Sequence, residues 1–188
     1  MTSKELCTVA RSFAGAETCY LKGFWLQKLT QAEYDRVLKM YPRNAIYNNT
    51  KYIGTNCYPA DCICFIKAIT SGATLDRRIS YAELAKGPLG DCTNSAFMQK
   101  LYDEVPTGIV PAGYGIASEK HAALSLGAGV WIDCNYDEAQ NGVKIHTGGV
   151  PAGFKCGKIP GIVYPESDLR DELRGFTDWL IDKYMESR

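Results

Sequence analysis

Residues 61–69 have the sequence DCICFIKAI, an acidic residue followed by a stretch that is apolar apart from Lys67. Aspartate is a favoured helix N-cap, so this stretch predicts a buried helix that begins at Cys62 and ends near Ser71-Gly72. The first backbone N–H groups of a helix have no partner within the helix, and the helix dipole is positive there. A cysteine at this position is a candidate nucleophile, because these groups stabilise its thiolate.

The overall composition is typical of one globular domain. The chain has 188 residues, of which 46% are hydrophobic and 22% charged, and its formal net charge is zero. Proteins that follow nucleic-acid phosphates need a basic surface, so we expect no nucleic-acid partner. No apolar run reaches the length of about 18 residues that indicates a membrane span. The N-terminal MTSKELCTVARSF lacks the continuous apolar segment of a secretory signal, so we expect synthesis in the cytoplasm without a signal peptide.

The eight cysteines fit neither a disulfide framework nor a metal site. Disulfide frameworks belong mainly to short secreted chains. Zinc sites use closely spaced ligand pairs, whereas this chain has no CxxC pair and only two histidines. We expect mostly reduced, buried cysteines with one reactive thiol, and no metal ion or other cofactor. Cys64 lies about 200° around the helix from Cys62, so we expect it to face the core and not the same cleft.

Helical patterns precede strand patterns, which predicts an α+β fold and not a βαβ series. Apolar spacing predicts one helix over 3–14, with Ser3 as its cap, and a second that starts at Thr30 with a capping box to Glu33. The remaining predictions are a long loop over 43–60, short helices within 79–104, three short strands over 121–127, 130–136 and 142–149 in an antiparallel meander, and another strand near 158–164. We expect one catalytic domain over 1–165 and a C-terminal amphipathic helix over 166–188 packed on it.

His121 and Asp133 are candidates for a base and the residue that orients it. His121 opens the first of the three strands, and a hairpin at 127–129 would bring Asp133 beside it on the next strand. The carboxylate could then accept the second ring N–H and fix the tautomer of the imidazole. His146, one strand further on, competes as base, orienter or substrate contact. Taken singly, a buried helical cysteine and a histidine at a strand start are more often structural.

Three segments together resemble a known family. DCICFIKAI is similar to the nucleophile motif of NlpC-type cell-wall peptidases, in which an Asp-Cys pair opens the central helix. HAALSLGAGVWIDCN, at 121–135, is similar to that family's histidine strand, turn and polar-residue strand, and CYLKGFW, at 19–25, resembles its aromatic stretch. The Asp-Cys-x-Cys form and the acidic third residue are most similar to the phage-encoded branch. The resemblance covers roughly residues 9–147.

The resemblance implies a papain-like (NlpC-type) core, in which the nucleophile helix packs on an antiparallel sheet. It implies Cys62 as nucleophile, His121 as base and Asp133 as orienter. It also implies Tyr20 near the oxyanion, and Asp61 either near a free amine of the substrate or as a structural cap. The substrate class that it implies is the peptide part of peptidoglycan, cleaved between D-glutamate and the diamino acid.

The expected function is therefore that of a thiol hydrolase from a phage lysin, a phage tail or a secreted effector, acting on the cell wall after release or delivery. An effector would be accompanied by an immunity protein. The same triad could serve an N-acetylmuramoyl-L-alanine amidase or an acyltransferase. A non-catalytic module that binds cell wall or protein is the alternative of another class. A redox or zinc protein is the least supported, because the ligand spacing is absent.

Overall fold

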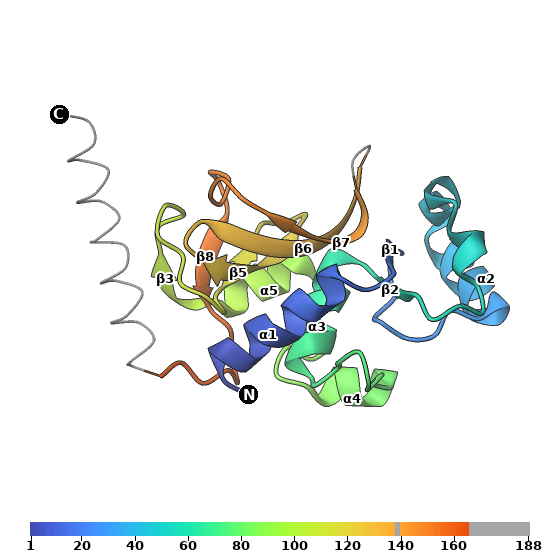
Figure 1. The fold of residues 1–188 in the computed structure, drawn as a ribbon, viewed down its shortest axis with the longest axis horizontal. Helices are drawn as coiled ribbons and strands as arrows, with labels where there is room; N and C mark the ends of the chain where they lie inside the picture. Colours follow the sequence, from blue (N-terminus) through green and yellow to red (C-terminus); the bar gives the residue numbers. More distant parts are fainter. Residues whose placement is uncertain (138–139, 166–188) are drawn as a thin grey trace.

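A computed structural model of the protein describes residues 1–137 and 140–165. It contains a six-stranded antiparallel sheet with helices packed on one face (Figure 1), so the predicted α+β class is confirmed. The helix expected over 166–188 lies outside the described residues. No helix of the described part is long and apolar enough to cross a membrane.

The large sheet places the strand that follows His121 next to the strand of Asp133. Its strands, in spatial order, are β3 (Tyr102–Val105), β8 (Lys155–Lys158), β4 (Gly115–Ala117), β5 (Ala122–Gly127), β6 (Val130–Asp137) and β7 (Gln140–His146). The predicted meander is confirmed for β5, β6 and β7, which pair as consecutive antiparallel neighbours. Ala123 pairs with Asp133, so the carboxylate lies close to the start of β5.

Two expectations for the strands were wrong. The strand expected near 158–164 ends at Lys158, because Pro160 has no N–H to donate and Gly161 adopts a φ of 78°. This strand, β8, lies between β3 and β4 in the sheet. His121 precedes β5 instead of opening it, because its backbone N–H bonds to the Ser118 hydroxyl at 3.2 Å.

The predicted central helix is α3 (Cys62–Thr70), and all of its residues are buried. Asp61 caps it by accepting a hydrogen bond from the Cys64 N–H, and the chain leaves the helix at Ser71 as expected. The helix packs against β5, β6 and α1 (Ser3–Ala14). The layer that carries Cys62 is therefore fixed directly on the strands that carry the predicted base and orienter.

The caps of the two earlier helices differ in detail from expectation. Thr2, and not Ser3, is the N-cap of α1, and it forms a complete capping box with Glu5. Helix α2 (Gln31–Met40) begins after Thr30, whose hydroxyl accepts from the Glu33 N–H. The other half of that predicted box is missing, because the Glu33 carboxylate pairs instead with Arg36 at 2.8 Å.

The helix α2 belongs to a small lobe with its own apolar cluster, which we call the α2 lobe. The cluster consists of Leu21, Phe24, Leu29, Tyr34 and Val37. The expected loop over 43–60 instead forms the 3-10 helices η1 (Pro42–Tyr47) and η2 (Asn49–Tyr52) and the strand β2 (Tyr58–Ala60). Strand β2 pairs in parallel with β1 (Thr18–Tyr20), and this pair lies between the lobe and the large sheet (Figure 1). The short helices expected within 79–104 are α4 (Tyr81–Lys86) and α5 (Asn94–Lys100).

Candidate functional site

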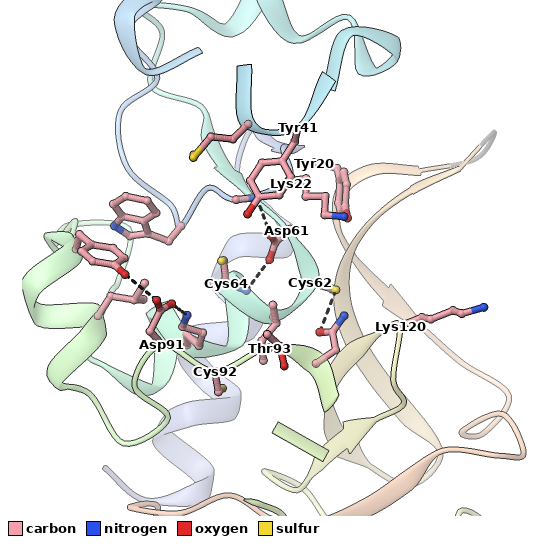
Figure 2. A pocket seen from close by; sticks show the side chains of 18 of the residues that line it. Tyr20, Lys22, Tyr41, Asp61, Cys62, Cys64, Asp91, Cys92, Thr93 and Lys120 are labelled. Atoms are coloured by element: carbon pink, nitrogen blue, oxygen red, sulfur yellow. Dashed lines mark hydrogen bonds and ion pairs between the residues drawn. The ribbon is translucent and has the colours of Figure 1, made fainter. Parts of the chain in front are cut away.

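Cys62 borders a cavity of about 890 Å³ that the α2 lobe and α3 line together (Figure 2). The lobe and the segment after β1 contribute Tyr20, Lys22, Gly23, Trp25, Glu33, Arg36, Met40 and Tyr41. The opposite wall comes from α4, from residues 91–94 and from residues 119–120. Cys64 belongs to the buried core cluster, as expected, but it also lines this cavity, because the cavity extends along α3 instead of ending at its first turn.

Asp61 fixes the start of α3 to the turn that follows β1. One carboxylate oxygen accepts from the Cys64 N–H and the other from the Gly23 N–H, both at 2.7 Å. Burial raises the pKa of this carboxyl, although the bonds from Gly23 and Cys64 act to lower it. Of the two roles that the resemblance implied for Asp61, the cap is the one seen directly in these contacts.

The structure brings His121 and Asp133 into direct contact, which confirms the predicted pairing. The Nε2 atom of His121 lies 2.7 Å from Oδ2 of Asp133, and only 1% of the Asp133 side chain is exposed. Burial acts to lower the pKa of His121, but hydrogen bonds to Asp133 and to Cys62 outweigh it and raise the pKa to about 10. His121 is thus an imidazolium at neutral pH, and Nδ1 is the nitrogen left for the Cys62 sulfur.

Asp133 is also bound through its other oxygen. Oδ1 lies 2.9 Å from Nε2 of His146 and accepts from Nε2 of Gln140 at 2.9 Å. Burial acts to raise the pKa of Asp133, but the bonds from His121, Gln140 and His146 prevail and lower it. His146 therefore does not replace Asp133, because both histidines bind the same carboxylate. Gln140 was missed, although strand alternation places it on the same face as His146.

The ring of His146 is itself held in place by Trp131. The two rings stack with centroids 4.0 Å apart and planes at 14°, and the Trp131 indole N–H donates to the Gly149 carbonyl at 3.0 Å. This stacking directs Nε2 of His146 toward Asp133. The carboxylate that orients His121 is in this way connected to the outer strands of the sheet.

A second residue that sequence reasoning missed is Asn94. The Cys62 sulfur lies 3.7 Å from its Oδ1 atom, and this contact is the dashed line that leaves Cys62 in Figure 2. Asn94 is the first residue of α5, which Thr93 caps. No motif marks it in the sequence, because its closeness to Cys62 depends on how α5 docks on the sheet at β4.

Tyr20, at the end of β1, reaches the same cavity as Cys62. Its ring packs edge-on against Tyr47 with centroids 5.1 Å apart, and its backbone N–H donates to the Asn141 side chain at 2.8 Å. Burial, reinforced by the nearby Cys62 and Asp61, raises the pKa of Tyr20 well above its ordinary range. Its hydroxyl therefore keeps its proton at neutral pH and can act as a hydrogen-bond donor.

All eight cysteines have free thiols. Among the described residues, no group of three or more His, Cys, Asp or Glu side chains is arranged to hold a metal ion. What the site does contain is a thiol at a capped helix start, an imidazolium fixed by a buried carboxylate, and nearby donors. That combination is suited to nucleophilic acyl transfer.

No protein-family model, curated protein or solved structure matches this chain. The activity of this site is therefore inferred from the geometry of Cys62, His121 and Asp133 and from the sequence motifs that contain them.

Proposed function

We propose that this chain is a cysteine peptidase with a papain-like, NlpC-type core that hydrolyses the peptide part of peptidoglycan. The observation that carries the proposal is the contact between His121 and Asp133, in which Nε2 lies 2.7 Å from a buried carboxylate, together with Cys62 at the capped start of α3. Each member has the role that its surroundings favour. Cys62 is the nucleophile, His121 the acid and base, and Asp133 the orienter.

In the first step the Cys62 thiolate attacks the carbonyl carbon of the scissile amide. A new S–C bond forms, and the electron pair of the carbonyl π bond moves to oxygen as an oxyanion. When the intermediate collapses, the C–N bond breaks and His121 gives its proton to the leaving amine. The products of this step are a free amine and a thioester on Cys62.

In the second step water replaces the sulfur. Neutral His121 takes a proton from the water, and the hydroxide oxygen attacks the thioester carbonyl. Collapse breaks the S–C bond, which releases a carboxylic acid and leaves the charge on sulfur, while His121 keeps the proton that it took from water. Asp133 keeps its charge throughout and stabilises the imidazolium in both steps.

The substrate class follows from the resemblance to NlpC-type peptidases, and the cavity is compatible with it. Stem peptides carry both carboxylates and ammonium groups, and the cavity is lined by side chains of both signs, among them Lys22, Arg36, Glu119 and Lys120. The proposed scissile bond joins D-glutamate to the diamino acid. A phage lysin, a phage tail enzyme or an effector with its immunity protein would each use such an activity.

Digestion of purified muropeptides tests the proposal. The wild type should release a new amine at the diamino acid, seen by mass spectrometry, and Cys62→Ala should release none. Cys156→Ala is the matched control, because it removes a buried thiol that does not line the cavity and should keep the activity. Cleavage between muramic acid and alanine, or transfer to an added amine, would replace the peptidase with the amidase or transferase. Undiminished cleavage by Cys62→Ala would refute the assignment, and absence of any cleavage would favour a binding module.

A further inference from the structure

We propose that Asn94 is a catalytic residue of this site, whose side-chain amide donates a hydrogen bond from Nδ2 to the oxyanion formed on the substrate carbonyl. The inference rests on the proposed function, because it assigns a group to the same acyl-transfer step. It adds a donor that neither the sequence motifs nor the triad supplies.

The position of Asn94 is the first argument. Its amide lies 3.7 Å from the atom that attacks the carbonyl, and both residues line the same cavity (Figure 2). The carbonyl oxygen of a substrate bonded to this sulfur must lie within a few ångström of it. An amide this close to the nucleophilic sulfur is thus within hydrogen-bonding reach of the carbonyl oxygen that becomes charged.

The charge state of the site gives the second argument. In the proposed mechanism the attacking form of Cys62 is the thiolate, which can accept hydrogen bonds but has none to donate. An amide oxygen facing a thiolate would be repelled. Rotation by about 180° about the terminal torsion, which is soft in asparagine, exchanges Oδ1 and Nδ2 and turns a donor toward the sulfur. That same donor then faces the oxyanion.

Preorganisation is the third argument. Within the part of the chain that the structure describes, Nδ2 of Asn94 donates to no other group, so the donor is available. The segment before it is held by Asp91, whose carboxylate binds Lys67 at 2.8 Å and the Tyr81 hydroxyl at 2.7 Å. Thr93 in turn caps α5. A donor held in place before the reaction needs little reorganisation to stabilise the developing charge.

The proposal assigns two hydrogen-bond donors to the oxyanion. One is the Cys62 backbone N–H at the first position of α3, and the other is Nδ2 of Asn94. Tyr20 lines the same cavity and is the rival for the second place. The variants Asn94→Leu and Tyr20→Phe separate the two, because each removes the polar group of one residue while keeping a side chain of similar size.

The test compares two reactions of the same thiol. Alkylation of Cys62 by iodoacetamide needs the thiolate but forms no oxyanion, whereas muropeptide hydrolysis needs both. Asn94→Leu should lower kcat by about 10²–10³-fold, the usual effect of losing one oxyanion donor, and change the alkylation rate by less than about threefold. Asn94→Ala should behave in the same way if the leucine variant fails to fold. Ser95→Ala, the next residue of α5, is the matched control and should change neither rate.

Four outcomes would overturn the proposal. An unchanged kcat in both Asn94 variants would refute it and leave the peptidase intact, and a large loss in Tyr20→Phe alone would give the role to Tyr20. Equal losses in hydrolysis and alkylation would show that Asn94 only positions the thiol. A wild type that cleaves no muropeptide would overturn the proposed function and this inference together.

Discussion

Replacement of Asp133 by asparagine tests how the site depends on one buried carboxylate. The side chain is 1% exposed and meets three nitrogen atoms, one each from His121, Gln140 and His146, at 2.7–2.9 Å. Asparagine has nearly the same shape but only one acceptor oxygen, and its NH₂ group must face at least one of these nitrogens. The variant therefore removes the charge and also leaves one of the three contacts unsatisfied.

The expected magnitude follows from the bond that is lost. A hydrogen bond to a charged group contributes about 1.5–3 kcal/mol, which corresponds to roughly a 10- to 150-fold loss in kcat/KM if His121 is no longer held. A neighbouring opposite charge shifts a pKa by about 1–3 units, so the pKa of His121, about 10 in the wild type, should fall by that amount in Asp133→Asn.

Titration followed by NMR measures this shift directly, because the chain contains only two histidines, His121 and His146. The His146→Gln variant assigns the two ring signals. Circular dichroism before and after substitution confirms that the variant is folded. If the His121 signal titrates at the same pH in Asp133→Asn and kcat/KM is unchanged, Asp133 is not the orienting residue and the triad is wrongly assigned.

Three further predictions concern the surroundings of the triad. Asp61→Ala should lower the free energy of unfolding, measured in urea, by about 2–4 kcal/mol, because it removes the cap of α3 and leaves the Gly23 N–H without an acceptor. A loss below about 0.5 kcal/mol would contradict the double role of this carboxylate. His146→Phe keeps a ring stacked on Trp131 but has no donor for Asp133, so its kcat/KM should fall about 10-fold. The kcat/KM of His146→Gln should stay within about threefold of the wild type. Equal kcat/KM in the two variants would limit the role of His146 to stacking. The raised pKa of His121 means that the folded state binds the extra proton, so its stabilising contribution is complete below about pH 6.5 and is lost as the pH rises toward about 10. Over that window the free energy of unfolding should fall more steeply in the wild type than in His121→Gln, by at most about 1.4 kcal/mol per pH unit, and parallel slopes would refute the shift.

The central helix and the histidine–aspartate contact could be predicted because local rules fix both. Asp61 before a continuous apolar run marks a capped, buried helix, and α3 begins and ends where that pattern does. A short glycine turn with alternating strands fixes the register of β5 and β6, which brings Asp133 to His121. In both cases the interacting residues are close in sequence or joined by one hairpin.

The strand order of the sheet and the approach of Asn94 to Cys62 could not be predicted, because they depend on contacts between elements that are distant in sequence. The position of β8 between β3 and β4 is a long-range pairing that its own residues do not specify. Asn94 approaches Cys62 only because α5 docks on the sheet at β4, far along the chain from α3. Cys64 is buried in the core as predicted, but it also lines the cavity, because the cavity follows the helix instead of ending at the helix start.

The central claim is that Cys62 is a nucleophile activated by His121, and the rate of its alkylation by iodoacetamide at neutral pH tests this most directly. Peptide mass spectrometry gives the rate at Cys62 and at the other seven cysteines in one experiment. The account predicts that Cys62 is labelled first, although it is only 5% exposed, and that His121→Gln slows this labelling at least about 10-fold while the fold is kept. Slow labelling of all eight cysteines, or an equal rate at Cys62 in wild type and His121→Gln, would contradict it.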